Sequence, residues 1–304
     1  MHLLAKPFLA KPFLLVALTL PFLPTGFGQE RAVNKALADS PKAYALFGPD
    51  GRPLAWPEVV AQAADADVVC FGELHDDPSM HWLQAQLVRD LLALGLAPAL
   101  GAEMLEADDQ LVVDEYLAGI INTDKLKAAA NLWPNHFTDY HPLVDLAKEH
   151  GLPFIATNVP RRYASYVYAN GLEGLDALSD DAKAYLPPLP VPFDITLPGY
   201  DAMLAMGGGH GGETLPMAQA IKDATMAHFI ASNLPEGAPF VHFNGAYHSQ
   251  NREGIVWYLQ QSRPDLRILT IHGHLQPDVA VPDSSALVAG DVLLITNENM
   301  TRTH

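Results

Sequence analysis

Several side chains that can bind a metal ion or transfer a proton come directly after short apolar runs of the sequence. Glu73, His75 and Glu103 each follow such a run, and His248 follows a later one. Glu73 and His75 are two positions apart, so both can point the same way where the chain leaves a strand. The sequence therefore predicts one site that contains two carboxylates and two imidazoles.

This set of groups suits two kinds of chemistry. It could bind a divalent metal ion through mixed nitrogen and oxygen ligands, or it could act as an acid/base group without a metal. In a hydrolase, Glu73 or His75 would activate a water molecule, and Glu103 would orient the reactants or ligate the metal. The structural alternative is that Glu73 accepts backbone N–H bonds and that His75 caps a turn.

A second group of candidates is cationic and aromatic. Arg161 and Arg162 follow Pro160 at a predicted helix start, where they suit an anionic group such as a carboxylate or a propionate, or form a surface salt bridge. Aromatic residues in helices often belong to the core, but a tyrosine can also stack on a flat ligand or ligate ferric haem. The candidate tyrosines are Tyr163, Tyr166, Tyr168 and Tyr200.

A third group consists of histidines and methionines that suit copper or zinc. His210 interrupts a glycine run and could be a mobile ligand or a solvated loop residue. The candidate set for such an ion is His210, His272, His274, Met203 and Met206. In contrast, His242 lies within an apolar run, where we expect a hydrogen-bonded core histidine.

The elements that position these residues are predicted from short apolar runs, which alternate with segments of helical periodicity. Continuous apolar runs indicate strands that are buried on both faces, as in a largely parallel sheet flanked by helices. The runs are 68–71, 99–102, 153–156, 239–243, 266–271 and 292–295. We therefore predict an α/β fold whose candidate site lies at the carboxyl ends of the strands. The segment 160–235 is predicted to be an inserted helical lid subdomain.

Composition excludes several classes of function. The 304 residues include 18 Lys+Arg and 35 Asp+Glu, which gives a net charge of −17. Such a charge repels a phosphate backbone, so we expect no nucleic-acid partner. The single cysteine excludes an intrachain disulfide and any metal cage built from several cysteines.

The first 28 residues have the layout of a signal peptide. Lys6 and Lys11 precede the apolar run 13–20, and small residues surround the expected cleavage point after Gly28. An uncleaved membrane anchor is the alternative. Residues 29–304 would then form the exported domain, in the periplasm or secreted. No cysteine directly follows the apolar run at the expected cleavage point, so we do not expect an N-terminal-Cys lipoprotein.

Several ordered motifs resemble the ChaN family of haem-binding uptake proteins, within the wider Tiki/erythromycin-esterase-like superfamily. They lie at residues 68–76, 101–104, 109–110, 158–162, 222–227 and 244–248. The resemblance implies an α/β fold with a helical lid, export to the bacterial envelope, and haem bound at a dimer interface with tyrosine ligation. It also implies that the positions of Glu73, His75, Glu103 and His248 serve hydrolysis or metal binding in catalytic branches of the superfamily.

Three functions are therefore predicted, in order of preference. The first is an exported haem-binding protein of haem or iron acquisition, with an outer-membrane uptake receptor as a partner and a ligand-linked homodimer as its assembly. The second is a hydrolase that uses Glu73, His75, Glu103 and His248, with or without a divalent metal ion. The third is an envelope copper or zinc binding protein.

Overall fold

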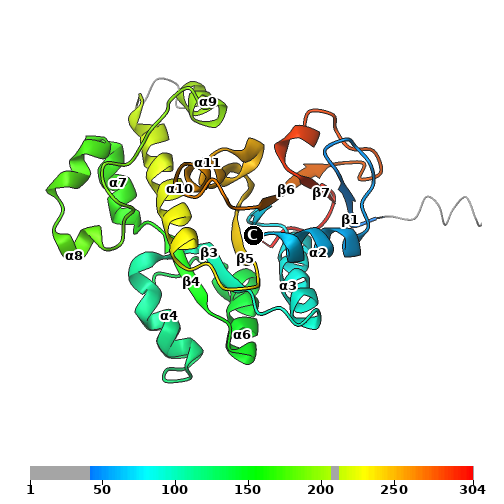
Figure 1. Ribbon diagram of the computed structural model, residues 1–304, viewed down its shortest axis with the longest axis horizontal. Helices are drawn as coiled ribbons and strands as arrows, with labels where there is room; N and C mark the ends of the chain where they lie inside the picture. The colour runs from blue at the N-terminus through cyan, green and yellow to red at the C-terminus, as the bar shows by residue number, and fades with distance from the viewer. Residues whose placement is uncertain (1–41, 207–211, 304) are drawn as a thin grey trace, which may run out of the picture. The chain divides into compact units, whose positions relative to one another are not determined.

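A computed structural model describes residues 42–206 and 212–303, and its centre is a seven-stranded sheet (Figure 1). The strands lie in the order β1-β7-β6-β2-β5-β3-β4. Their bounds are β1 Tyr44–Phe47, β2 Val68–Glu73, β3 Ala99–Glu106, β4 Phe154–Asn158, β5 Phe240–Gly245, β6 Ile268–Gln276 and β7 Val292–Asn297. Only the pairing of β1 with β7 is antiparallel, and every other pairing in this sheet is parallel. The predicted α/β fold with a largely parallel sheet is confirmed.

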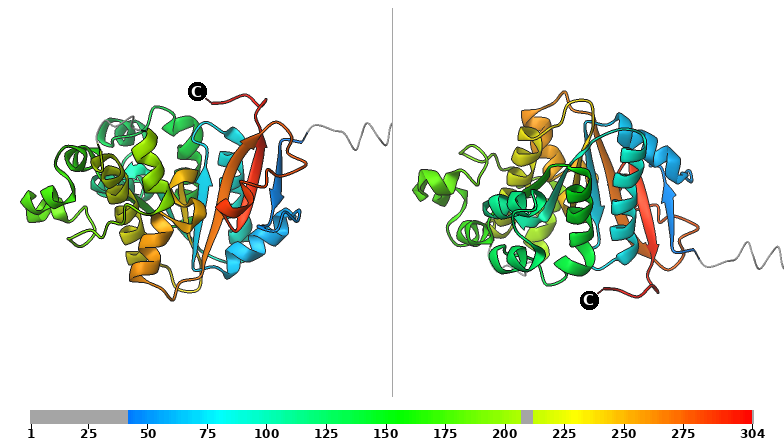
Figure 2. Two further views of the ribbon diagram at one scale, coloured as in Figure 1. Left: turned by 90° about the horizontal axis from the view of Figure 1, so that it is seen from above. Right: turned by 90° about the horizontal axis from the view of Figure 1, so that it is seen from below.

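Helices cover both faces of the sheet (Figure 2). One face packs against α2 Trp56–Asp65, α3 Pro78–Ala93, α4 Gln110–Leu117, α5 Thr123–Ala129 and α6 His141–His150. The other face packs against α7 Arg161–Asn170, α10 Thr214–Ser232 and α11 Ile255–Ser262. β2 and β5 are buried along their whole length, and most of their side chains are apolar, as expected of strands covered on both faces.

The start of α3 shows how the sequence fixes a helix beside the candidate site. Asp77 precedes Pro78, and its Oδ1 accepts the backbone N–H groups of Ser79 at 2.9 Å and Met80 at 3.2 Å. Its Oδ2 accepts the hydroxyl of Thr296 on β7, at 2.5 Å. One buried carboxylate therefore caps α3 and ties the helix to a strand distant in sequence.

The segment between β4 and β5 is helical. It contains α7, α8 Asp180–Lys183, α9 Pro198–Met206 and α10. Its last helix, α10, contributes buried residues such as Ile221 and Met226 to the layer under the sheet. Two sequence predictions, the signal peptide at 1–28 and a ligand role for His210, fall outside the described residues. No helix in the described part of the chain is long and apolar enough to cross a membrane.

Candidate functional site

The carboxyl ends of the central strands bring four predicted site residues together. Glu73 ends β2, Glu103 lies in β3, and β5 runs between these two strands. The backbone N–H of Gly245, the last residue of β5, donates to Glu103 Oε2 at 2.7 Å. A Cβ atom at Gly245 would lie only 2.7 Å from His75 Nε2. A glycine is therefore required here, because it lets the imidazole lie against the end of β5.

Glu73 is buried in a tight set of hydrogen-bond donors. Its Oε1 accepts the hydroxyl of Tyr140 at 2.8 Å and pairs with His75 Nδ1 at 2.9 Å. Its Oε2 accepts the amide of Gln84 at 2.5 Å, and His81 Nε2 lies 3.5 Å from Oε1. Burial opposes ionisation, but the hydrogen bonds and charges of the two histidines outweigh it and lower the pKa of Glu73 to about 2.

Glu103 and His248 belong to a buried polar chain that continues into the helical insertion. His248 Nε2 lies 3.1 Å from Glu103 Oε1, and His248 Nδ1 lies 2.5 Å from Asp223 Oδ1 on α10. The hydroxyl of Tyr200 on α9 donates to Asp223 Oδ2 at 2.8 Å. Tyr200 is 3% exposed, so its hydroxyl serves this chain and does not face an open cavity.

Glu103 and His248 are both charged at neutral pH. Burial opposes a charge on His248, but the two flanking carboxylates outweigh it and raise its pKa to about 10. Burial also opposes ionisation of Glu103, whose pKa is nevertheless held well below its usual range by His248 and His75. Neither Glu73 nor His248 titrates near pH 7, where a general acid or base works best. Glu73 and His248 are therefore better suited to electrostatic positioning than to proton transfer.

The remaining member, His75, is half-buried, and its imidazole packs edge-on against Trp133 with 4.9 Å between ring centroids. Burial lowers its pKa, but the hydrogen bond to Glu73 and the charges of Glu103 and Glu73 outweigh this effect and raise it. His75 is therefore biased towards the imidazolium form, which can attract an anion.

The metal site predicted for Glu73, His75, Glu103 and His248 has no support in this geometry. No group of three or more His, Cys, Asp or Glu side chains in the described residues is arranged to hold a metal ion. The physical reason is that the four groups satisfy one another and their neighbours through hydrogen bonds and ion pairs.

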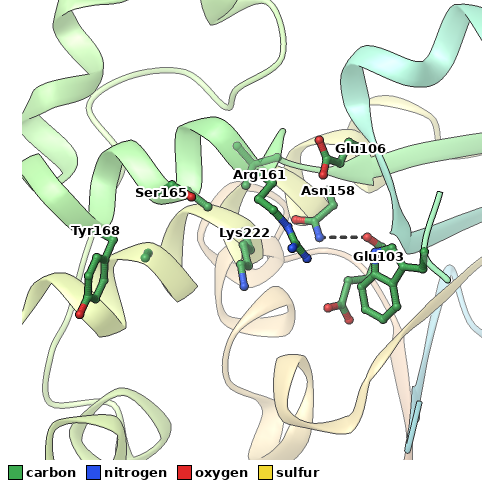
Figure 3. Close-up of a pocket in the computed structure, with 11 residues that line it drawn as sticks. Glu103, Glu106, Asn158, Arg161, Ser165, Tyr168 and Lys222 are labelled. Atoms are coloured by element: carbon green, nitrogen blue, oxygen red, sulfur yellow. Dashed lines mark hydrogen bonds between the residues drawn. The ribbon is translucent and has the colours of Figure 1, made fainter. Parts of the chain in front are cut away.

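A cavity of about 480 Å³ opens beside Glu103, between β3, β4, α7 and α10. Its lining includes Trp133, Val159 and Ala164 together with two cationic side chains, Arg161 and Lys222. Figure 3 shows these two cations between Tyr168 at one end and Glu103 at the other. Neither cation pairs with another residue in the described part of the chain. A smaller cavity of about 270 Å³ shares Trp133 and Arg161 with it.

A family model described as haem-binding uptake, Tiki superfamily, ChaN matches residues 59–259, which is more than half of the chain. This chain belongs to the ChaN family. Membership supports a haem-binding role at the level of the family. A search of curated proteins finds no match.

One solved structure agrees with this fold, and a second match is weaker. A structure of ChaN of Campylobacter jejuni, which describes cofacial haem binding to that protein, is 19% identical with a TM-score of 0.62, and the match covers 84% of this chain and 98% of that one. A mutant of the erythromycin esterase EreC is 13% identical with a TM-score of 0.44, and the match covers 84% of this chain and 83% of that one. At 19% identity the likeness to the Campylobacter jejuni protein concerns the fold alone.

The other residues predicted to contact a ligand in this ChaN-family chain lie in different surroundings, and only some of them line the 480 Å³ cavity. Tyr168 lines the 480 Å³ cavity and is 44% exposed, whereas Tyr163 is half-buried against the α7 and α10 layer. Tyr166, also half-buried, does not line that cavity. Arg162 lies outside it, because its guanidinium pairs with Asp108 at 2.5 Å. Of the two predicted arginines, only Arg161 faces the cavity.

A second cavity, of about 740 Å³, lies on the other side of the polar cluster. Glu73, His75 and His248 lie on one side of it, and His272 and His274 of β6 contribute on the other. Burial, and then the charge of His274, lower the pKa of His272 to about 4. His272 is therefore neutral at pH 7. Met203 is not among the residues that line this cavity.

His242, by contrast, is a hydrogen-bonded core histidine, as expected. Its Nε2 lies 2.8 Å from the hydroxyl of Thr157, and its Nδ1 lies 3.1 Å from Asn244 Oδ1. Burial lowers its pKa to about 4, although the bond to Asn244 opposes that shift. Both ring nitrogens are satisfied, and the side chain is fully buried.

Sequence reasoning did not identify several residues of the site. Asp223 and Lys222 lie within a motif that resembles the family, but neither was assigned a role. Tyr140, Gln84 and Trp133 come from helices or turns, where no strand end marks their direction. The apolar periodicity of α3 could have shown that Gln84 lies on its buried face, between the core positions 83 and 87.

Proposed function

We propose that this ChaN-family protein binds haem in the 480 Å³ cavity beside Glu103. The observation that carries the proposal is the pair of unpartnered cations, Arg161 and Lys222, in a cavity that also contains Trp133 and Tyr168. A cavity of this size lies within the range of small-molecule sites. Its lining combines apolar surface for a flat ring with cations for carboxylates.

The residues fit the chemical parts of haem. Arg161 and Lys222 would each pair with a propionate, because charged hydrogen bonds between cations and carboxylates are stronger than neutral ones. Val159, Ala164 and Trp133 would contact the apolar ring. The phenol of Tyr168 would be the axial ligand, since tyrosinate binds ferric haem iron.

The charges of the polar cluster favour binding over hydrolysis. A hydrolase needs a group that exchanges a proton near the working pH, but the pKa of Glu73 is about 2 and that of His248 is about 10. In our proposal these residues hold the ends of β2, β3 and β5 in place beside the cavity.

We also propose the cellular context that the sequence predicted. Residues 1–28 would direct export to the periplasm or beyond, and the protein would take part in haem or iron acquisition with an outer-membrane receptor and as a ligand-linked homodimer. Support comes from the basic and apolar layout of residues 1–28 and from family membership. Cell fractionation with and without residues 1–28 tests this part: loss of the leader should leave the protein in the cytoplasm.

The cavity is tested by hemin titration followed through the Soret band. A double variant, Arg161→Gln and Lys222→Gln, should weaken binding about tenfold or more, because each charged hydrogen bond contributes about 1.5–3 kcal/mol before solvent screening. The matched control is Arg162→Gln with Lys183→Gln, since both of these cations lie outside the cavity. Equal weakening in the two double variants would contradict the proposal.

The axial ligand is tested by a pair of tyrosine variants on the same helix. Tyr168→Phe should change the Soret position and the spin-state signature of the hemin complex, because the phenolate oxygen is lost. Tyr166→Phe should leave both unchanged, since Tyr166 does not line the cavity. If Tyr168→Phe has the spectrum of the unsubstituted complex, another residue ligates the iron.

A further inference from the structure

The second cavity contains two imidazoles that no other part of the site uses. His272 and His274 are two positions apart on β6, so they lie on the same face of the sheet. Their ring centroids are 6.4 Å apart, and their planes differ by only 27°. Two side-by-side imidazoles therefore border a cavity of about 740 Å³.

His272 is buried but, unlike His242, unsatisfied. It is 8% exposed, and its Nδ1 has no hydrogen-bond partner. His242, on strand β5 of the same sheet, has a partner for each ring nitrogen. A buried polar atom without a partner costs free energy unless water, an ion or a ligand compensates for it. His272 therefore differs from His242, because one of its ring nitrogens is buried without a hydrogen-bond partner.

The acidic groups of this cavity are already engaged. Glu73 is held by His75 and Tyr140, and Asp76 pairs with Arg302 at 2.5 Å. The atoms of this cavity that can bind a ligand are therefore imidazole nitrogens rather than carboxylate oxygens. Imidazole nitrogen selects Ni²⁺, Cu²⁺ and Zn²⁺ over Mg²⁺ and Ca²⁺, which prefer oxygen ligands.

We propose that His272 and His274 bind a divalent transition-metal ion of this group in the second cavity. The described residues hold no set of three metal-binding side chains around one point, so the pair supplies two ligands and leaves the other positions to water or a small molecule. The site is distinct from the haem cavity, because the two cavities share no lining residue. Each can be tested without the other.

The test is a titration of the full-length protein with Zn²⁺ by calorimetry and with Co²⁺ by absorption. We expect one ion per chain, and a loss of affinity of about tenfold or more for His274→Ala, since even indirect disturbance of a metal ligand costs about 10–100-fold. The double variant His272→Ala with His274→Ala should show no specific binding. His150→Ala, an exposed histidine on α6, is the matched control and should bind like the parent protein.

His274 is half-buried, so its variant is expected to fold, and circular dichroism of each variant checks this. Undiminished Zn²⁺ affinity in His274→Ala, equal loss in His150→Ala, or no binding by the parent protein would each overturn the proposal. Hemin titration of the same variants should give the parent affinity. If Zn²⁺ does not bind but hemin binds normally, only the metal proposal is refuted. If Zn²⁺ binds but hemin does not, only the haem proposal is refuted.

Discussion

The substitution Glu73→Gln tests how the buried cluster stabilises the fold. The pKa of Glu73 is about 2, compared with an ordinary value of 4.5. Lowering the pKa by about 2.5 stabilises the folded state by about 3 kcal/mol when this carboxylate is ionised. Glutamine keeps the size of the side chain and removes the charge, so the variant should lose this contribution at pH 7.

The sign of the pH dependence follows from the lowered pKa. The contribution is fully present above about pH 4.5 and disappears as the pH falls towards 2. At pH 3 less than half of it should remain. The stability difference between the parent protein and Glu73→Gln should therefore shrink from pH 7 to pH 3. Urea denaturation at pH 7, 5 and 3 gives the free energy of unfolding of each protein.

Glutamine also places an amide against Gln84 and so adds a cost that does not depend on pH. The test is therefore whether the difference in free energy of unfolding between the parent protein and Glu73→Gln changes with pH. Glu149→Gln, at an exposed position on α6, is the control and should differ from the parent protein by a small amount at every pH. A Glu73→Gln difference that stays constant from pH 7 to pH 3 would refute the reasoning.

Three further substitutions test the rest of the cluster. Gly245→Ala places a methyl group 2.7 Å from His75 Nε2, so the imidazole should move away from Glu103 and its pKa, followed by NMR, should fall; an unchanged titration would contradict this. Asp223→Asn leaves His248 with one carboxylate and should lower the free energy of unfolding, measured with urea, by about 3–5 kcal/mol. A loss below about 1 kcal/mol would show that Asp223 contributes little to the charge pairing of His248. Tyr200→Phe removes the 2.8 Å bond to Asp223 and should cost about 1–3 kcal/mol, a prediction that parent-like thermal unfolding would disprove.

The convergence of the site could be predicted because it follows from the direction of parallel strands. Apolar runs indicated β2, β3 and β5, and residues at the carboxyl ends of such strands share an edge. Glu73, Glu103 and His248 could therefore be grouped without any knowledge of strand order.

The partners of these residues could not be predicted in the same way. Tyr140 and Asp223 reach the cluster from helical segments, and the rotation of a helix against a sheet depends on packing that spacing does not determine. Similarly, Arg161 and Arg162 are neighbours in sequence, but one faces a cavity and the other pairs with Asp108. The geometry gives no support to a metal ion held by Glu73, His75, Glu103 and His248, and the mutual pairing of these groups depends on separations that sequence spacing does not determine.

The most direct measurement of the central claim is a crystal structure of the protein grown or soaked with hemin. We expect flat density in the cavity lined by Trp133 and Ala164, with propionates at Arg161 and Lys222 and the iron facing Tyr168. Haem density seated instead in the cavity of His75 and His274, or a hemin-soaked crystal in which the Arg161 cavity is empty, would contradict it.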